Sequence, residues 1–471
     1  MWQQRRLLFC SCFVSLYCLE ETDDVTKEKA GKGIHARELA LNILLEILER
    51  GGLSHVVLSQ ALGKYQYLEK QERALITRIT EGTLEYLIQI DYVLNRYSVT
   101  KVSKMKPFIR TLLRMSVYQI LYLDRIPDSA VCNEAVKLAE KRHFQGLKGF
   151  INGVLRTVSR EKEHMVFPDD SVRYSVPLWL LEMWKAVYPR DTVEAMLSSF
   201  LEERRLFVRC NLGRASREEI RESLESQGVG VKDSEYSQAV FCLEGINYLE
   251  ALEAFQKGWI QVQDFSSSLV ALAAAPREGD YCIDVCGAPG GKSLHVADLM
   301  KGTGTVEVRD VSARKTALIE ENIKRSGFAN MKAVVMDALV FDEASFEKAD
   351  VLIADLPCSG LGIIGRKPDI KYRMTLKGIE ELAGLQREIL SVVWQYVKPG
   401  GTLVYSTCTI SRKENEENAA WFAENYPFRP VNIEGRFGNH IQSETMKGGT
   451  LQLLPGIDPG DGFFLAVFER I

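Results

Sequence analysis

The segment from about residue 260 to the C-terminus alternates five short apolar runs with longer amphipathic ones. The apolar runs have the length and the Val, Ile and Tyr content of strands, whereas the segments between them have helical spacing. Such alternation is typical of a parallel sheet with crossover helices. The predicted strands are "YCIDVC", "TVEVRD", "KAVVMD", "DVLIADL" and "TLVYST", and the last follows a long predicted helix over residues 379–401 and its Gly-Gly turn. The sequence therefore predicts a doubly wound α/β domain, in which ligands bind beyond the carboxyl ends of the strands.

A helical region precedes this domain, from residue 34 to about residue 162. Its segments "ARELALNILLEILERGG", "KPFIRTLLRMSVYQILYL" and "GFINGVLRTVSR" each place apolar residues at helical spacing, which predicts a small bundle. Residues 34–162 carry 20 lysines and arginines against 13 aspartates and glutamates, a charge of +7 in a chain of net charge −4. Such a surface either binds phosphates or is a solvated helical face.

Residues 165–250 show a third pattern, of short strands around one helix. "LFVRCN" and "AVFCLEG" are the predicted strands. The helix in "SREEIRESLESQG" begins with a capping box of Ser216 and Glu219 and ends at Gly228. We therefore predict a small α+β module between the bundle and the α/β domain.

The first thirty residues have a basic start followed by an apolar run from Leu7 to Leu19. The shape is that of a signal peptide, but there is no convincing small-x-small cleavage site and the run is short for a membrane span. We expect residues 1–32 to be a non-native or misassigned leader of unknown role.

The composition and the cysteines restrict the class of protein. The chain has 471 residues, too many for one hydrophobic core, and its 46% apolar and 26% charged residues are ordinary for a soluble globular protein. Its ten cysteines include no CxxC pair and no histidine-rich ligand set, which argues against a zinc site and a disulfide framework. We expect a reducing, cytoplasmic location, no metal and no association with a membrane.

The first strand of the α/β domain ends in "DVCGAPGGKS", residues 284–293. Its glycines allow a tight turn and a close ligand approach just before a helix N-terminus. The turn is neither GxGxxG nor a Walker A loop, so NAD and ATP are disfavoured. Asp310 ends the second strand, where related folds bind ribose hydroxyls; Asp337 follows the third and either receives an adenine amino group or caps a helix. Together these features predict S-adenosylmethionine, an adenosine ligand without a polyphosphate.

Two cysteines follow the next two strands: Cys358 in "ADLPCSGLG" and Cys408 in "YSTCT". A free cysteine taken alone is most often a buried structural residue. Beside a methyl donor, however, a thiolate that adds to carbon 6 of cytosine makes carbon 5 able to accept a methyl group. This chemistry also needs a base and an acid near the ring nitrogen, and Asp355 is the candidate acid.

These motifs resemble those of the bacterial small-subunit ribosomal RNA cytosine-C5 methyltransferases of the Sun/Fmu type. The resemblance covers nearly everything after Gly33 and rests on "VQDFSSSLVA", "DVCGAPGGKS", "DLPCSGLG", "GRKPDIKYR", "YSTCT" and "GDGFFLAVFER". It implies a multidomain chain with a helical RNA-binding domain similar to NusB at 33–164, an α+β connecting module at 165–255, and a Rossmann-like methyltransferase domain at 256–471.

The resemblance also implies roles for individual residues. Cys408 would be the nucleophile, Cys358 would assist product release, and Asp355 would contact both the base and the cofactor. The residues implied in S-adenosylmethionine binding are Cys286, Gly287, Ala288, Pro289, Gly290, Gly291, Lys292, Asp310, Asp337 and Asp355. The implied substrate is one cytosine of 16S ribosomal RNA, and we expect the enzyme to be a monomer.

Three residues depart from the family pattern. Gly287 and Leu356 stand where alanine is common, and Arg309 is unusual before the ribose acid. None of these changes removes a reacting group, although Leu356 is expected to crowd the base pocket. Two alternatives stay open: a transfer RNA cytosine-C5 methyltransferase with the same chemistry, and a catalytically idle RNA-binding assembly factor.

Overall fold

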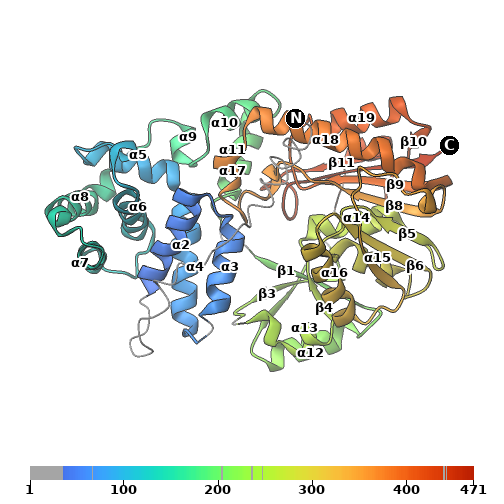
Figure 1. Ribbon diagram of the computed structural model, residues 1–471, viewed down its shortest axis with the longest axis horizontal. Coiled ribbons are helices and arrows are strands. Elements are labelled where there is room, and N and C mark those ends of the chain that lie inside the picture. The colour runs from blue at the N-terminus through green and yellow to red at the C-terminus, as the bar shows by residue number, and fades with distance from the viewer. Residues whose placement is uncertain are drawn as a thin grey trace. The chain divides into compact units, whose positions relative to one another are not determined.

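The computed structural model describes residues 36–65, 67–202, 205–234, 237–246, 248–438, 441 and 443–471. The expectation for residues 1–32 lies outside these ranges. The chain divides into two compact units, residues 1–178 and 179–471, and each is described by itself (Figure 1).

The first unit is a bundle of helices around one apolar core (blue to green in Figure 1). The predicted helices are present, with α2 ending next to Gly51 and α6 beginning at Pro107, a favourable first residue. The apolar stripe of α6, which includes Ile109, Leu112 and Leu113, is buried. The helices are α2 (Ala36–Arg50), α3 (Ser54–Lys64), α4 (Lys70–Glu85), α5 (Leu87–Tyr97), α6 (Pro107–Tyr122), α7 (Asp128–Lys141), α8 (Lys148–Glu161) and the short α9 (Asp170–Arg173).

Helices α10 (Leu178–Lys185) and α11 (Arg190–Ser199) come before the first strand. The prediction of a single helix over residues 165–250 was therefore wrong. Prolines directly before each helix limit them to 8 and 10 residues, too short for the helical period to stand out in the sequence. Their buried faces include Leu181, Trp184 and Met196.

A four-stranded antiparallel sheet follows, in the order β2-β3-β1-β4. Its helix α12 (Arg217–Ser226) begins with the predicted capping box of Ser216 and Glu219. Ile220 and Leu224 of α12 pack into the apolar cluster of the sheet. The remaining elements are β1 (Leu206–Cys210), β2 (Gly230–Asp233), β3 (Val240–Glu244), the short α13 (Glu253–Gln256) and β4 (Ile260–Val262).

The large sheet has the order β10-β12-β9-β8-β5-β6-β7, with β11 paired to β12. Strands β9, β8, β5, β6 and β7 are parallel, whereas β10, β11 and β12 pair antiparallel. The chain runs from β5 through β6 to β7 and then returns to the other side of β5 at β8, so the ligand crevice of such a sheet is expected beyond the end of β5. The strands are β5 (Tyr281–Asp284), β6 (Thr305–Asp310), β7 (Met331–Val335), β8 (Ala349–Asp355), β9 (Val397–Thr407), β10 (Phe428–Pro430), β11 (Thr450–Leu453) and β12 (Phe463–Arg470).

Alternate residues of the central strands face two separate cores, as the pleat of a strand requires. Val351 and Ile353 of β8 pack toward one set of helices, and Leu352 and Ala354 toward the other. The helices of the first set are α14 (Phe265–Ala274), α15 (Gly291–Leu299) and α16 (Ala313–Ser326); those of the second are α18 (Leu376–Val393) and α19 (Glu416–Asn425). The two sets cover opposite faces of the sheet (Figure 1).

One boundary differs from the sequence prediction. Helix α18 ends at Val393 and β9 begins at Val397, so the helix does not reach residue 401 and the glycine pair lies inside the strand. Gly400 has a φ of +77°, and the pairing of β9 with β8 shifts register around it. In the sequence the glycine pair indicates a turn, whereas in the structure it forms an irregularity within β9.

None of the helices in the described ranges combines the length and the apolarity that a membrane span requires. The described residues also contain no group of three or more His, Cys, Asp or Glu side chains placed to hold a metal ion. The seven described cysteines are free thiols.

Candidate active site

Cys358 and Cys408 meet beyond the carboxyl ends of β8 and β9. The two strands are parallel neighbours, so the loops that follow them lie side by side. The Sγ atoms of the two cysteines are 3.4 Å apart. Both side chains are partly exposed, in contrast to the buried Cys132, Cys210 and Cys282.

The surroundings of the two thiols differ in charge. The hydrogen bond from Cys358 lowers the pKa of Cys408 and outweighs the opposing effect of burial, and Lys292 and Lys367 lower it further. The pKa of Cys358 lies well above its usual value because its proton is bonded to Cys408, because the site is buried, and because Glu414 is near. Cys408 is therefore the more readily ionised of the two thiols, with Cys358 beside it at hydrogen-bond distance.

A fully buried carboxylate, Glu414, holds the loop of Cys358. Its Oε1 accepts a hydrogen bond from Ser359 N at 2.8 Å, and its Oε2 accepts one from Ser359 Oγ at 2.5 Å. Gln386 Nε2 donates to Glu414 at 3.2 Å and to a main-chain oxygen of the same loop at 2.9 Å. Ser359 Oγ is also 2.7 Å from Thr409 Oγ1, so this network joins the two cysteine loops.

Sequence reasoning missed Glu414 and its neighbour Asn415, which is also fully buried. Asn415 accepts a hydrogen bond from Thr407 Oγ1 at 2.6 Å and donates to Thr409 O at 2.9 Å. Both residues lie in "SRKENEEN", a stretch that is typical of a solvated turn before a helix. The polar residues of this stretch do not show in the sequence that two of them are buried. The one feature that could have pointed to them is that the stretch directly follows the Cys408 loop.

Asp355 and Lys292 form an ion pair near Cys408. Lys292 Nζ lies 2.6 Å from Asp355 Oδ2, and Ser406 Oγ donates to Asp355 Oδ1 at 2.8 Å. Burial alone would lower the pKa of Lys292, but Asp355 outweighs it, so the pKa is raised and Lys292 is an ammonium. Asp355 and Lys292 shift the pKa of Cys408 in opposite directions, so both act on that sulfur.

Residues 286–292 form the turn from β5 into α15. Gly287 N donates to Arg309 O at 2.8 Å, which joins the turn to β6. A Cβ on Gly287 would lie 2.4 Å from Val308 Cγ1, so this chain has no room for the alanine that is common in the family. The other members of the turn include Cys286, Ala288, Pro289, Gly290 and Gly291, with a cis bond between Ala288 and Pro289.

Three carboxylates lie close to the ends of β5, β6 and β7. Asp310 Oδ1 accepts a hydrogen bond from the main chain of residue 312, and Asp337 Oδ1 from that of residue 339, each at 3.0 Å. Asp284 Oδ1 is buried and has no hydrogen-bond partner among the described residues, and burial raises the pKa of this carboxyl to about 7. A ligand with an ammonium group and a ribose fits these acceptors.

Arg366 brings together three of the sequence motifs to which no role was assigned. Its guanidinium binds Asp264 Oδ2 at 2.7 Å and also binds Asp461. Asp461 N in turn donates to Asp264 Oδ1 at 3.0 Å. The three charges belong to "VQDFSSSLVA", "GRKPDIKYR" and "GDGFFLAVFER", so these motifs build one structural junction.

The Cys408 loop is also held by main-chain contacts between glycines. Gly362 N donates to Cys408 O at 3.1 Å, and Gly462 N donates to Gly362 O at 3.0 Å. A Cβ on Gly362 would lie 2.0 Å from Gly462 O, so no side chain fits there. Leu356 is buried in the apolar cluster of β8 and α18, which differs from the expectation that it crowds a base pocket.

Comparison with known families assigns each part of the chain. Residues 271–469 match the family described as 16S rRNA methyltransferase RsmB/F. Residues 34–160 match the NusB family, and residues 176–248 match the ferredoxin-like domain of RsmF/B-like methyltransferases. These matches confirm the predicted fold class of a NusB-like helical domain, a small sheet module and an α/β methyltransferase domain.

Individual proteins are similar over almost the whole chain. The probable ribosomal RNA small subunit methyltransferase B of Bacillus subtilis is 36% identical over 449 residues, which are 93% of this chain and 99% of that protein. The ribosomal RNA small subunit methyltransferase B of Cronobacter sakazakii is 33% identical, over 92% of this chain and 98% of that protein. The crystal structure of PH0851 superposes with a TM-score of 0.79 at 27% identity, over 93% of this chain and 100% of that one. The chain therefore belongs to the 16S rRNA methyltransferase RsmB/F family.

Proposed function

We propose that this chain transfers a methyl group from S-adenosylmethionine to carbon 5 of a cytosine in 16S ribosomal RNA, through a temporary bond between Cys408 and carbon 6. Family membership supports methyl transfer to ribosomal RNA. The relatives from B. subtilis and C. sakazakii are named for small-subunit ribosomal RNA, which favours this substrate over transfer RNA. The observation that carries the covalent route is the 3.4 Å contact between the sulfurs of Cys358 and Cys408 beyond the ends of two parallel strands.

In the first half of the reaction the Cys408 thiolate adds to carbon 6, forming an S–C bond and placing negative charge on the ring. We assign the ion pair of Lys292 and Asp355 to stabilise that charge near the ring nitrogen, because its ammonium lies within electrostatic reach of the Cys408 sulfur. Carbon 5 then takes the methyl group, which S-adenosylmethionine supplies as an activated sulfonium.

In the second half the carbon 5–hydrogen bond breaks and its proton passes to solvent water, the electron pair re-forms the ring double bond, and the bond between carbon 6 and Cys408 breaks so that the thiolate leaves. We assign Cys358 to this release. Its sulfur lies 3.4 Å from the leaving sulfur and its pKa is raised, so as a thiol it stabilises the returning negative charge.

The proposed donor site uses the turn after β5 and the acids at the ends of the neighbouring strands. Asp284 extends the predicted set, because its buried, unpartnered oxygen suits an ammonium group of the donor. The residues proposed to bind S-adenosylmethionine are Asp284 and the predicted Cys286, Gly287, Ala288, Pro289, Gly290, Gly291, Lys292, Asp310, Asp337 and Asp355.

Methyl-labelled S-adenosylmethionine and small-subunit RNA test the nucleophile. We expect Cys408→Ala to abolish transfer of label while Cys132→Ala, at a buried cysteine of the helical domain, keeps it. Transfer by Cys408→Ala at the wild-type rate would refute the covalent route.

The variant Cys358→Ala tests the release step. We expect it to accumulate a protein–RNA adduct through Cys408 that survives a denaturing gel. A double variant that also lacks Cys408 is the control and forms no such species. If Cys358→Ala turns over without any adduct, Cys358 has no part in release.

Two measurements separate the alternatives. Bisulfite sequencing of ribosomal and transfer RNA from a deletion strain identifies the pool that loses 5-methylcytosine. Isothermal titration with S-adenosylmethionine tests the idle assembly factor, since a scaffold without enzymatic function need not bind the donor. We further propose that the protein is cytoplasmic and that its domain limits lie at 33–164, 165–255 and 256–471. We also propose that it is a monomer, and light scattering tests this oligomeric state.

A further inference from the structure

We propose that Arg309 is a positioning residue for the methyl donor. It fixes the relative positions of the three loops that we call the donor edge, residues 286–292, 310–312 and 336–345, and donor affinity depends on it. The inference rests on the proposed function, which names S-adenosylmethionine as the ligand of these loops. Arg309 lies in β6 directly before Asp310, and its side chain is 2% exposed.

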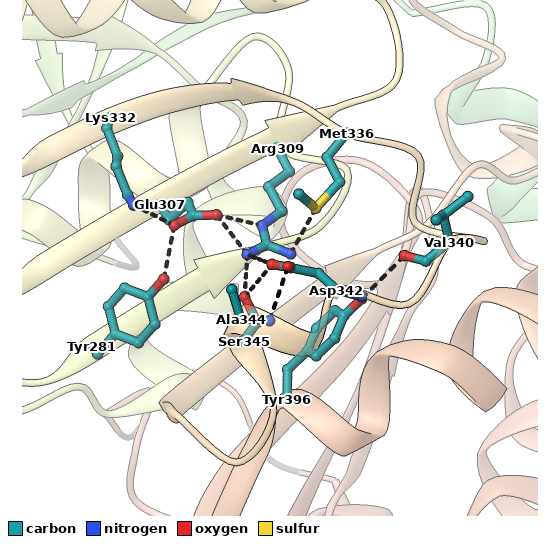
Figure 2. A network of polar contacts seen from close by, with 10 residues as sticks. All are labelled: Tyr281, Glu307, Arg309, Lys332, Met336, Val340, Asp342, Ala344, Ser345 and Tyr396. Carbon is teal, nitrogen blue, oxygen red and sulfur yellow. Dashed lines mark hydrogen bonds and ion pairs between the residues drawn. The ribbon is translucent and has the colours of Figure 1, made fainter.

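Arg309 contacts each of the three loops. Its main-chain oxygen accepts the hydrogen bond from Gly287 N, in the first loop, and the second loop begins at the next residue. Its side chain reaches the third loop, where the guanidinium lies 2.9 Å from Met336 Sδ, 3.2 Å from Asp342 Oδ2 and 2.5 Å from Ser345 Oγ. Figure 2 shows the guanidinium between Glu307 on one side and these three residues on the other.

The third loop is held by these polar side-chain contacts together with one main-chain hydrogen bond to β6, from Met336 N to Asp310 O at 3.0 Å, and with the packing of Ala338 and Leu339 against the core. No α-helix lies between β7 and β8; the connection contains only one 3₁₀ turn, at Glu343–Ser345. Val340 is 55% exposed and Phe341 39% exposed, so the middle of the loop is only partly buried, with the Phe341 ring stacked on Tyr396. Tyr396 supplies the other anchor, since its hydroxyl donates to Val340 O at 3.2 Å and accepts from Asp342 N at 2.9 Å (Figure 2).

Arg309 also stacks on the second anchor, with its guanidinium 5.3 Å from the ring centre of Tyr396. Removing the guanidinium therefore breaks the side-chain contacts of Met336, Asp342 and Ser345 with β6 and loosens the packing on the tyrosine, so that the main-chain bond of Met336 N to Asp310 O is left to hold the start of the loop. Asp337, the acid proposed for the adenine end of the donor, lies in the same loop. We infer that the loop then samples positions in which Asp337 no longer faces the donor, so binding weakens while the cysteines are untouched.

We expect Arg309→Met to fold, because the buried acid next to the arginine keeps two other partners. Glu307, the acid partner of Arg309 at 2.6 Å, is also bound on its other oxygen by Lys332 Nζ at 2.6 Å and by Tyr281 OH at 2.7 Å. Its charge is therefore still paired in Arg309→Met. Asp342→Asn is a second variant that weakens only the contact with the third loop.

The experiment measures the Kd of S-adenosylmethionine by titration, together with the steady-state constants for donor and RNA. In Arg309→Met we expect the Kd and KM of the donor to rise about tenfold, with kcat at saturating donor and the KM of RNA within about twofold of wild type. Arg309→Lys, which keeps the charge, and Asp342→Asn should show smaller increases in the same constants. A loss of kcat with unchanged donor affinity would overturn the assignment.

Arg470→Met is the matched control. Arg470 is a second buried arginine, which binds Val397 O and, at 2.6 Å, Glu347 Oε1. We expect its replacement to lower Tm without changing the donor Kd. If both variants raise the donor Kd equally, Arg309 stabilises the fold in general and does not position the donor. If wild type itself binds no donor, the proposed function fails; if wild type binds and Arg309→Met binds equally well, only this inference fails.

Discussion

The two parts of the sheet edge are built in different ways. At the cysteine edge, residues 355–362 and 406–415, buried polar side chains such as Glu414 and Asn415 bond to the loops and keep two sulfurs in contact. At the donor edge the main chain itself is presented, through a turn in which Gly287 admits no side chain, and Arg309 joins the loops. On the proposed function, buried polar side chains thus support the reacting sulfurs, while main chain and carboxylates bind the methyl donor.

This difference predicts that damage to each edge will have a different kinetic signature. Displacing a sulfur by a fraction of a bond length disturbs attack and release, which lowers kcat. Displacing a binding loop weakens the donor complex, which raises its KM. The predictions below test that separation, from the largest effect to the smallest.

The largest effect is expected for Glu414→Gln. The amide would turn an N–H group toward one of the two Ser359 donors that the carboxylate now accepts. Because a misplaced loop of this kind costs about 100-fold in rate, we expect kcat to fall by about that factor with an unchanged donor Kd. Stopped-flow or steady-state methylation measures the first quantity and titration the second.

Glu380→Gln is the control for that variant, because among the described residues the exposed Glu380 forms an ion pair with Lys413 alone. It should leave both constants unchanged. If Glu414→Gln instead weakens donor binding and leaves kcat intact, the contrast between the two edges is wrong.

An intermediate effect is expected for Gly287→Ala. The added Cβ would lie 2.4 Å from Val308 Cγ1 and 2.8 Å from the Asp284 carboxyl carbon, so the turn must move. Overpacking of this kind costs about 1–3 kcal/mol, and if this cost falls on the donor-bound shape of the turn, the donor Kd rises by about fivefold or more. Gly384→Ala, in α18 with open space around the position, is the control and should bind the donor normally. Wild-type affinity in Gly287→Ala would show that the donor does not use this turn.

The smallest effect concerns the titration of Cys408. Its pKa is lowered chiefly by the hydrogen bond from Cys358, so replacing that donor should raise it. We expect the pH midpoint of Cys408 alkylation by iodoacetamide, followed by mass spectrometry, to move upward in Cys358→Ala. An unchanged midpoint would mean that the neighbouring thiol does not support the thiolate.

Much of this arrangement could be predicted from the sequence because it depends on chain order. The five parallel strands are apolar and β-branched, and parallel strands end at one edge, which is why Cys358 and Cys408 were expected to be neighbours. The antiparallel strand β12 was not predicted, since "GDGFFLAVFER" becomes a strand only by pairing with β9 along the sheet. Burial of charged side chains was equally hidden, because Glu414 and Arg309 owe their positions to partners far away in the chain.

The contact between Gly362 and Gly462 has a consequence for reading substitution data. Any side chain at position 362 collides with main chain, whether or not the protein turns over. A saturation library should therefore be depleted at this position even in a background where residue 408 is already inactive and free to vary. Screening that library for protein abundance would separate residues that are needed for folding from residues that are needed for the reaction.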